Sequence, residues 1–454
     1  MTATAPAETR RFETPVGEIV GYVDGDVVRM LGVPYARAGR FEVPRPVHPT
    51  LSPFQAFQRG PASPQSVTPI LEQLVEGGSD GMTASEDCQN LSITLPADIA
   101  PEERLPVMVW IHGGAYVTGA GDLDVYDPRD LVVEQRVVVV NVTFRLGLLG
   151  FFGDGATIPA NLGLLDLIEA LRWLHANVES VGGAADQVTL FGQSAGGDAI
   201  AHLMISEGAR GLFRRAIIES APLGISAGRS AMVRAMVAAV SGGSPDGLAS
   251  LRDAPVDDLL ARQGVAERAA LRGGLRAGMA FGTQYGFAPL PAEGEREEAW
   301  RDVAPDVDVL IGSTVDETGL YLPFVPVLRS MVRMPRLGSS IRAAIVRPST
   351  WVTYKRDVAR FAARHRAAGG TALTYELSWA PRGLTTGSVH MSELPLLLGT
   401  RRAWEKTSFV GRTPWSEIAE RGPVLRAAWA SFARTGAIDE ALEQKLAGTV
   451  ALGR

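Results

Sequence analysis

The residues of this 454-residue chain with the clearest chemical potential are the five from Gly192 to Gly196, which read Gly-Gln-Ser-Ala-Gly. They lie between an apolar run at 187–191, expected to be a strand, and a run with helical periodicity that begins at Ser194. An abrupt strand-to-helix turn strains the serine backbone and exposes its oxygen, while the flanking glycines relieve crowding. The pattern therefore predicts that Ser194 is a nucleophile. An ordinary glycine-rich turn is the alternative.

A second small-residue segment could donate hydrogen bonds to the same reaction. Gly113, Gly114 and Ala115 follow the expected strand 107–112. Acyl transfer needs backbone N–H groups directed at the developing oxyanion, so the candidate donors are those of Gly114, Ala115 and Ala195. A phosphate-binding loop is the alternative, but the segment lacks the lysine or the Gly-x-Gly-x-x-Gly pattern that such a loop would use.

Six histidines could act as the base that a serine nucleophile needs. Five lie before the expected sheet, in an expected strand or in expected helices: His48, His112, His175, His202 and His365. The last of these falls in an arginine-rich helix that we expect to be solvated. His390 lies in a loop after the expected strand 371–379, and in enzymes with a serine on such a turn the base comes last in the chain. We predict that His390 is the base, with a structural loop histidine as the alternative.

A carboxylate must orient that base, and it should follow a strand between Ser194 and His390. The expected strand 307–313 leads directly to Asp316 and Glu317. Either carboxylate could therefore orient the base. A carboxylate that only offsets the dipole of a helix is the alternative interpretation.

Strands and helices must position these residues. Short apolar runs rich in β-branched residues predict strands, and apolar residues at helical spacing predict a helix over 161–181. Strands that alternate with helices favour an α/β fold, with a mostly parallel sheet covered on both faces. The expected strands are 107–112, 137–142, 187–191, 215–220, 307–313 and 371–379.

The chain shows no repeat and no long linker, so we expect one catalytic unit over residues 11–454. Residues 1–10 are expected to form a mobile tail. Two mainly helical insertions, around 225–300 and 320–369, are expected to lie over the sheet.

Composition excludes several classes of protein. The chain is 46% apolar and 21% charged, with a net charge of −6, which argues against a disordered or collagen-like protein and against a nucleic-acid partner. No run approaches the roughly 18 apolar residues of a membrane span. Cys88 is the only cysteine, so there is no intrachain disulfide and no cysteine-based zinc site. The first residues lack the apolar core of a secretory signal, and we expect a cytoplasmic protein.

Taken in order, the motifs resemble those of the type-B carboxylesterases of the α/β-hydrolase superfamily, which include bacterial para-nitrobenzyl esterase-like enzymes and the cholinesterases. The resemblance runs from GVPYA (32–36) to WASFARTG (429–436), nearly the whole chain. The motifs between them include SEDCQNLSI (85–93), VWIHGGAYVTGAG (109–121), NVTFRLG (141–147), VTLFGQSAGG (188–197), IGSTVDETGLY (311–321) and VHMSELPLLLG (389–399).

The resemblance implies roles for individual residues. It favours Glu317 over Asp316 as the acid, and it also selects His390. It implies that Ser220 supports the acid through a hydrogen bond. The pair Glu86 and Arg145 matches residues that form a buried salt bridge in the family, so both are expected to be structural.

The resemblance also implies an activity. We expect an α/β-hydrolase fold and a serine carboxylesterase that cleaves small to medium hydrophobic esters through an acyl-enzyme, without cofactor or metal. The alternatives are a non-catalytic binding module on the same fold, or a specialist in acyl transfer or in amide or carbamate cleavage. A nucleotide-binding oxidoreductase would need a dinucleotide fingerprint, which the sequence lacks. The expected partner is a small-molecule ester, and the sequence does not decide between a monomer and a homodimer.

Three departures from the family pattern bear on the substrate. Gln193 replaces the usual Glu before the nucleophile, which removes a negative charge next to the site. The loop 64–84 contains no aromatic residue, so it cannot build a cation–π pocket for a choline ester. Ser63 stands where the family has the disulfide partner of Cys88.

The segment 318–356 has a composition of its own. It contains no acidic residue and seven basic ones: Arg329, Arg333, Arg336, Arg342, Arg347, Lys355 and Arg356. A basic rim that attracts an anionic substrate is one interpretation, and a solvated surface is the other. The neighbouring apolar run 320–328 could line an acyl or alcohol pocket or belong to the core.

Overall fold

The computed structural model describes residues 6, 8–66, 82–324, 330, 334, 338–382 and 387–453. Most of the loop 64–84 and residues 325–328 of the apolar run lie outside the described residues. So do three of the basic side chains discussed above: Arg329, Arg333 and Arg336.

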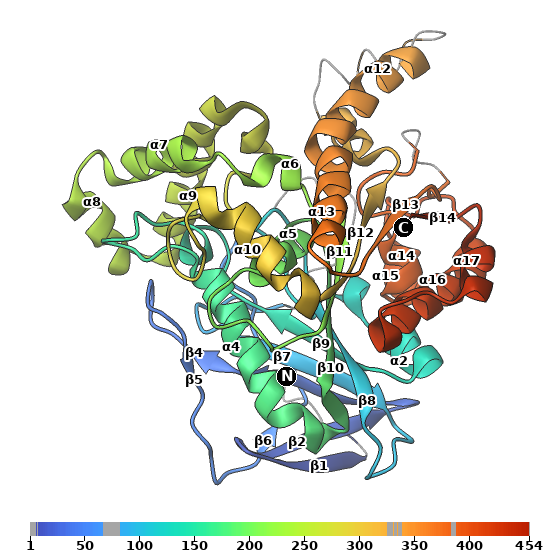
Figure 1. The fold of residues 1–454 in the computed structure, drawn as a ribbon. Helices are drawn as coiled ribbons and strands as arrows, with labels where there is room; N and C mark the ends of the chain where they lie inside the picture. The colour runs from blue at the N-terminus through green and yellow to red at the C-terminus, as the bar shows by residue number, and fades with distance from the viewer. Residues whose placement is uncertain are drawn as a thin grey trace.

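The centre of the described molecule is a 12-stranded mixed sheet (Figure 1). From edge to edge the strands are β1 (Thr9–Thr14), β2 (Gly17–Asp24), β3 (Val27–Pro34), β7 (Asn90–Pro96), β9 (Val138–Thr143), β8 (Leu105–Ile111), β10 (Gly183–Gln193), β11 (Arg215–Glu219), β12 (Asp308–Thr314), β13 (Ala372–Leu377) and β14 (Val450–Gly453). The short β6 (Phe54–Gln55) pairs with β2, and β4 (Ala36–Arg37) pairs with β5 (Arg45–Pro46) outside the sheet.

The strands that carry the predicted site form the parallel part of the sheet. β9, β8, β10, β11, β12 and β13 are parallel neighbours, whereas β1, β2, β3, β7 and β14 pair antiparallel, apart from the short parallel pair of β2 with β6. Each strand expected from a short apolar run is present. Continuous apolar runs suit this position, because central parallel strands are covered on both faces: every residue of β9 is buried.

Two hydrophobic cores cover the two faces of the sheet, and β8 contributes to both. Val107, Val109 and Ile111 belong to one core, and Met108 and Trp110 to the other. This alternation follows from the two-residue period of a strand. The first core holds side chains of α4 (Leu162–Asn177) and α5 (Ala195–Leu203). The second holds those of α2 (Arg129–Gln135) and α16 (Trp415–Thr435).

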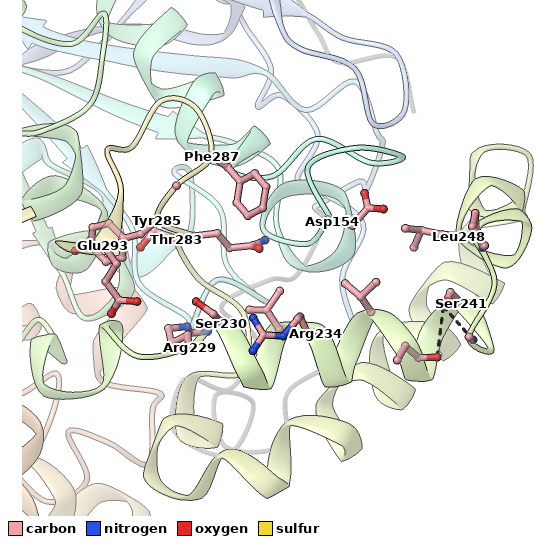
Figure 2. A pocket seen from close by; sticks show the side chains of 18 of the residues that line it. Asp154, Arg229, Ser230, Arg234, Ser241, Leu248, Thr283, Tyr285, Phe287 and Glu293 are labelled. Atoms are coloured by element: carbon pink, nitrogen blue, oxygen red, sulfur yellow. Dashed lines mark hydrogen bonds between the residues drawn. The ribbon is translucent and has the colours of Figure 1, made fainter. Parts of the chain in front are cut away.

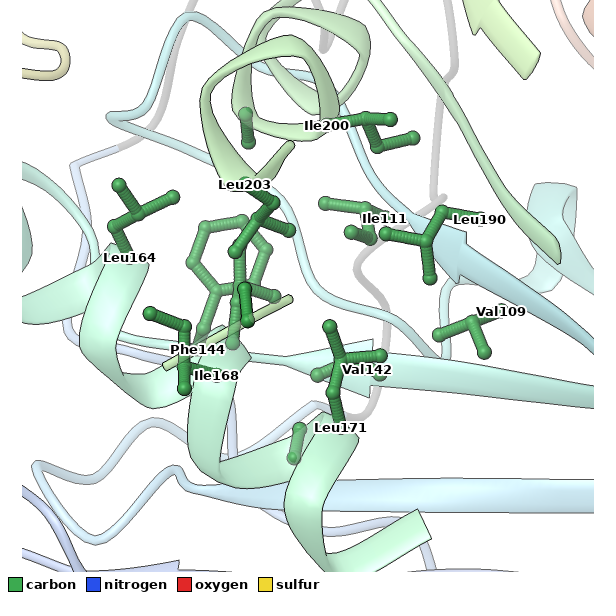
Figure 3. Close-up of a cluster of buried hydrophobic side chains, with 14 of the residues drawn as sticks. Val109, Ile111, Val142, Phe144, Leu164, Ile168, Leu171, Leu190, Ile200 and Leu203 are labelled. Atoms are coloured by element: carbon green, nitrogen blue, oxygen red, sulfur yellow. The ribbon is translucent and has the colours of Figure 1, made fainter. Parts of the chain in front are cut away.

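The helix predicted over 161–181 is confirmed as α4 followed by a 3₁₀ turn, η2 (Val178–Val181). Leu164, Ile168 and Leu171 are spaced along one face of α4 and are buried in the core shared with Val142 of β9 (Figure 3). Helical periodicity in the sequence therefore identified the face that packs on the sheet.

The two segments expected as insertions contain mostly helix. The first holds α6 (Leu223–Ser226), α7 (Ser230–Ser241), α8 (Pro245–Ala249), η3 (Ser250–Arg252), α9 (Val256–Ala270), η4 (Leu271–Met279), η5 (Glu293–Glu295) and α10 (Arg296–Val303), with η6 (Ala304–Asp306) following. The second holds η7 (Glu317–Phe324), α12 (Gly338–Thr350), a π-helical turn η8 (Trp351–Lys355) and α13 (Arg356–Ala367). In Figure 1, α7, α8 and α9 gather on one side of the sheet and α12 projects at the top.

The remaining helices are short, apart from α16. They are η1 (Asp124–Tyr126), α3 (Gly147–Gly150), α14 (Leu394–Leu397), α15 (Arg401–Trp404) and α17 (Glu440–Leu446). No helix within the described part of the chain is long and apolar enough to span a bilayer.

The predicted tail of residues 1–10 extends too far into the chain, because its last two residues belong to a strand. Thr9 and Arg10 already pair with Tyr22 and Gly21 in the β1–β2 ladder. Residues 1–5 and 7 lie outside the described residues. The tail was overestimated because a polar edge strand such as TRRFET lacks the apolar run that marks a buried strand.

Candidate active site

Ser194 lies on the turn between β10 and α5, with φ +59° and ψ −122°. This conformation is strained for an L-residue and is held by its surroundings: the Ser194 N–H donates to the Glu219 carbonyl at 2.8 Å. The flanking glycines make room for the neighbouring strand. A Cβ on Gly192 would lie 2.5 Å from the Ile111 carbonyl oxygen, and one on Gly196 only 1.9 Å from it.

His390 and Glu317 are in direct contact. Nδ1 of His390 lies 2.5 Å from Oε2 of Glu317, and both side chains are buried. The other carboxylate oxygen of Glu317 accepts the Thr314 N–H at 2.7 Å, at the end of β12. Asp316 takes no part in this contact: its Oδ2 faces Gly387, where a Cβ would lie 2.2 Å away. Of the two acids left open by spacing, Glu317 is therefore the one that can orient His390.

The second ring nitrogen of His390 faces Gln193. Nε2 of His390 lies 3.1 Å from Nε2 of Gln193. The rings of Tyr354 and Tyr321 pack beside the imidazole, with centroids 5.5 and 6.0 Å away. No motif in the sequence around Tyr354 indicates a place at the site.

The glycine-rich loop after β8 lies against the serine turn. A Cβ on Gly113 would lie 2.8 Å from the Gln193 carbonyl oxygen and 3.1 Å from Cβ of Ser194. Gly114 and Ala115 follow with φ of +108° and +54°, and both line the cavity that contains Ser194. The third candidate donor, Ala195, is the first residue of α5, where N–H groups lack an intrahelical acceptor. The three candidate donors thus lie around one serine.

Ser220 does not support Glu317, and this expectation was wrong. Its Oγ donates instead to Oε1 of Glu393 at 3.2 Å. Glu393 lies within hydrogen-bond reach of the Ser220 hydroxyl, whereas Glu317 is held by the Thr314 N–H and His390. Burial, together with the charge of Glu317, raises the pKa of Glu393 to about 7. A second buried carboxyl therefore lies beside the candidate acid, and the sequence analysis did not predict it.

Glu219 is a further buried carboxyl behind the site. It lies at the end of β11, and its Oε1 accepts the indole N–H of Trp429 at 2.5 Å. Burial raises its pKa well above the usual value, and the charge of Glu393 acts in the same direction. Burial thus raises the pKa values of two carboxyls behind the site, Glu219 and Glu393.

The expected salt bridge between Glu86 and Arg145 is also wrong. Arg145 forms a two-pronged contact with Asp166 of α4, with Nη2–Oδ1 at 2.7 Å and Nε–Oδ2 at 2.8 Å, and both side chains are buried. Glu86 pairs with the half-buried Arg40, whose Nε lies 2.9 Å from Oε2. Asp166 presents both oxygens to the planar guanidinium from a fixed helix position, which is the geometry that arginine binds best.

Two smaller expectations concern Cys88 and His365. Cys88 is a buried free thiol, and Ser63 uses its Oγ to accept the Leu146 N–H at 3.1 Å. His365 was expected on a solvated helix, but it is buried on the inner face of α13. Its Nε2 lies 2.8 Å from the Val307 carbonyl oxygen. Arg360 and Arg366 are exposed, but Arg364 packs over the rings of Trp300 and Phe361, so a run of arginines does not mark a fully solvated helix.

Ser194, His390, Gln193 and the glycine loop line one cavity of about 400 Å³. Its other walls are mostly apolar and come from four parts of the chain: Val117, Leu271, Ala277, Ala280, Leu320 and Met391. Within the apolar run 320–328, Leu320 and Tyr321 therefore face the cavity, and Leu322 is buried.

The basic residues of 318–356 that the structure describes do not form a rim on this cavity. Lys355 pairs with Glu376 at 2.7 Å and Arg356 with Asp357 at 2.8 Å. The charged side chain in the described lining is Glu267. This favours the interpretation of the segment as a solvated surface.

Residues 8–335 match the model of the Carboxylesterase family. The chain belongs to this family. Among its relatives, this carboxylesterase is 36% identical to a probable N-octanoylanthranilate hydrolase of Rhodococcus erythropolis, with 94% of this chain and 93% of the relative covered. It is 30% identical to the para-nitrobenzyl esterase of Bacillus subtilis, with 93% and 89% covered.

Solved structures agree with the sequence match. A PNB esterase structure superposes with a TM-score of 0.76 at 28% identity, covering 94% of this chain and 91% of that one, and a thermophilic PNB esterase superposes equally well. The expected α/β-hydrolase fold is confirmed, and this carboxylesterase is a hydrolase of carboxylic esters.

Proposed function

We propose that this carboxylesterase acts through an acyl-enzyme, with Ser194 as nucleophile, His390 as base and Glu317 as the acid that orients the base. The observation that carries the proposal is the 2.5 Å contact between Nδ1 of His390 and Glu317, in the cavity onto which the strained Ser194 turn opens. A non-catalytic binding module would have no need of a strained serine and a buried imidazole–carboxylate pair in one cavity.

The steps follow from the chemistry of these groups. Ser194 Oγ attacks the ester carbonyl while Nε2 of His390 takes its proton, and Glu317 stabilises the imidazolium. The N–H groups of Gly114, Ala115 and Ala195 bind the oxyanion; each such donor is typically worth about 10²–10³ in rate. The imidazolium then protonates the leaving alcohol. Water, activated by the same base, releases the acid and restores the serine. No cofactor takes part in these steps.

The substrates we propose are neutral, hydrophobic esters of small to medium size. The cavity of about 400 Å³ is lined mostly by apolar side chains, and the charged side chain in its described lining is Glu267. A carboxylate of that sign would repel an anionic substrate.

A second candidate function is cleavage of an amide between a medium-chain acid and an aromatic amine. It is supported by the Rhodococcus erythropolis relative, whose name describes the hydrolysis of N-octanoylanthranilate. The negative charge of Glu267 disfavours the anthranilate carboxylate itself, so the ester remains the preferred substrate class.

We also propose that the protein works in the cytoplasm on small molecules, without nucleic acid or membrane. The support is the mild negative net charge of −6 and the single, unpaired cysteine.

The test is hydrolysis of p-nitrophenyl esters by Ser194→Ala. We expect activity to fall to the background rate while the near-ultraviolet circular dichroism is unchanged. Residual turnover above a few per cent would exclude Ser194 as the nucleophile. A panel of p-nitrophenyl esters and p-nitroanilides of the same acids, from acetyl to decanoyl, separates the two candidate functions.

A further inference from the structure

A second cavity, of about 780 Å³, lies within the first helical insertion. It is bordered by α7, by the loop at 153–154 and by the segment 283–287, and none of its described lining residues lines the catalytic cavity. Figure 2 shows Arg229, Ser230 and Arg234 along the α7 side and Phe287 across from them. Its volume is within the range of ligand-binding pockets.

Arg229 is a buried cation with unused hydrogen-bond donors. The side chain lines the cavity but is only 4% exposed, and its Nη2 donates to the Ala280 carbonyl at 2.7 Å. Nε and Nη1 have no acceptor among the described residues. The guanidinium packs against Gly282, where a Cβ would lie 3.2 Å from Cζ. A buried donor without an acceptor destabilises the fold, and more so when it is charged.

The negative charge of Asp198 does not satisfy these donors. Asp198 raises the pKa of Arg229, although burial lowers it more. Its carboxylate oxygens accept from the hydroxyls of Tyr116 and Ser226. No ion pair joins Asp198 to Arg229 within the described residues, so Arg229 has a counter-charge nearby but no carboxylate partner.

Gln284 offers a second unused donor to the same cavity. Its Nε2 is buried and has no partner among the described residues. Its backbone is held by Asn161, which accepts the Gln284 N–H at 2.7 Å and donates to its carbonyl at 2.9 Å. Two residues that line one cavity therefore carry buried donor groups without an acceptor among the described residues.

The acidic residues of the wall are engaged elsewhere. Oδ1 of Asp154 accepts three backbone N–H groups, from residues 156–158. Oε1 of Glu293 accepts the Gly228 N–H at 2.6 Å and pairs with Arg296 at 3.1 Å. One oxygen of each carboxylate is thus bonded within the chain.

An apolar strip continues from the charged end. Arg229, Val233 and Val237 are spaced by four residues, so they lie on one face of α7 and its N-terminal cap. From Arg229 to Val237 the helix rises about 12 Å. Leu248 and Phe287 add to the strip, and Phe287 is 38% exposed, which is high for a side chain of its size.

We propose that this cavity binds a medium-chain carboxylate, with the head group on Arg229 and Gln284 and the alkyl chain along Val233, Val237 and Phe287. A carboxylate has two oxygens in a plane and suits a guanidinium fork together with an amide donor. The apolar strip matches the length of an alkyl chain such as that of decanoate. The site uses no residue of the proposed catalytic set, so it stands independently of the catalytic proposal.

The first experiment is calorimetric titration of the whole protein with decanoate and, separately, with decanol, both below the concentration at which they aggregate. We expect decanoate to bind at least tenfold more tightly than decanol, because only the carboxylate supplies oxygens to Arg229 and Gln284. Equal affinities would overturn the proposal, as would the absence of decanoate binding.

Variants locate the site. Val237→Trp fills the strip at a partly exposed position and should weaken decanoate binding at least tenfold, or remove one of two sites if the catalytic cavity also binds decanoate. Val133→Trp, at a 40% exposed position on α2, is the matched control and should bind like the wild type. Arg229→Met should abolish binding with circular dichroism unchanged; if it fails to fold, Val237→Trp decides alone. Full decanoate binding by Val237→Trp would overturn the assignment.

Discussion

The side-chain amide of Gln193 lies 3.1 Å from Nε2 of His390, the ring nitrogen that a base would offer to Ser194. Nδ1 of the same ring faces the Glu317 carboxylate and carries the hydrogen of that contact. Nε2 then carries a lone pair, and this lone pair accepts a hydrogen bond from the side-chain N–H of Gln193. The serine hydroxyl has to displace this N–H before His390 can take its proton.

Replacing Gln193 with methionine should therefore accelerate the enzyme. A typical net hydrogen bond is worth about 0.5–1.5 kcal/mol, so we expect kcat/KM for p-nitrophenyl acetate to rise by about two- to twelvefold. Gln135→Met, on α2, is the control and should leave the rate unchanged. A tenfold loss of kcat/KM in Gln193→Met would show instead that the amide holds the imidazole in its active orientation.

Glu317→Gln and Asp316→Asn should differ sharply. An amide in place of Glu317 can hold His390 in the wrong tautomer, and a change of this kind lowers kcat by about 10⁴-fold in a serine protease. Asp316 does not contact the ring, so we expect Asp316→Asn to change kcat less than threefold. Measured kcat values for the two variants decide which carboxylate is the acid, and comparable losses would contradict the assignment.

Glu393 should make the enzyme less stable as the pH rises. Its pKa is raised from 4.5 to about 7 by burial and by the charge of Glu317. Between these values the folded chain holds a proton that the unfolded chain has released. Its stabilising effect is therefore fully present below about pH 4.5 and is lost as the pH rises through about 7. The loss amounts to at most about 3 kcal/mol.

Glu393→Gln isolates this effect, because its amide oxygen can still accept the Ser220 hydrogen bond. Relative to the wild type, we expect its free energy of unfolding to increase by about 2–3 kcal/mol between pH 5 and pH 8. Urea unfolding at both pH values measures this change. The exposed Glu298→Gln is the control and should track the wild type. A pH-independent difference for Glu393→Gln would rule out the raised pKa.

Asp166→Asn tests the observed partner of Arg145. Because the variant leaves a buried guanidinium without its counter-charge, we expect it to lower the free energy of unfolding by about 3–5 kcal/mol. Glu86→Gln, which affects a half-buried pair with Arg40, should cost less than about 1 kcal/mol. Equal costs in urea unfolding would instead favour the pairing of Glu86 with Arg145 expected from the family.

Cys88 should be unreactive until the chain unfolds. The side chain is fully buried, and burial raises the pKa of the thiol, so almost no thiolate, the reactive form, is present at neutral pH. We expect no reaction of the native protein with Ellman's reagent within an hour. One thiol per chain should react after unfolding in guanidinium without reductant. Rapid labelling of the native protein would contradict the burial of Cys88.

The sequence predicted best the features that depend on local pattern. The strand, turn and helix around Ser194 follow from a short motif whose glycines meet the carbonyl of Ile111, and α4 follows from its period. His390 could be selected from its place after a strand. These features require only neighbours in the chain and the general geometry of a parallel sheet.

Side-chain partners were predicted less well, because several groups compete for each one. Arg145 could have formed its salt bridge with Glu86 or with Asp166, and it pairs with Asp166 because α4 places that carboxylate beside it. Ser220 donates to Glu393, and Glu317 is bonded instead to Thr314 and His390. Gln193 was noted for its lost charge, but its contact with His390 depends on the rotamer. Such competitions are settled only when distant segments are packed together.

The candidate residues are spread over parallel strands that lie far apart in the chain. Glu317 and His390 are separated by 73 residues and Gln193 and His390 by 197, and the strands between them pair through long crossovers. Folding of such a topology is slow, because loops must close before the contacts form. During synthesis the turn that carries Ser194 leaves the ribosome long before His390. Until then the apolar strands around it lack their neighbours in the sheet and can be bound by chaperones. Activity should therefore return last on refolding, after compactness and helix content, which makes ester hydrolysis a reporter of completed folding.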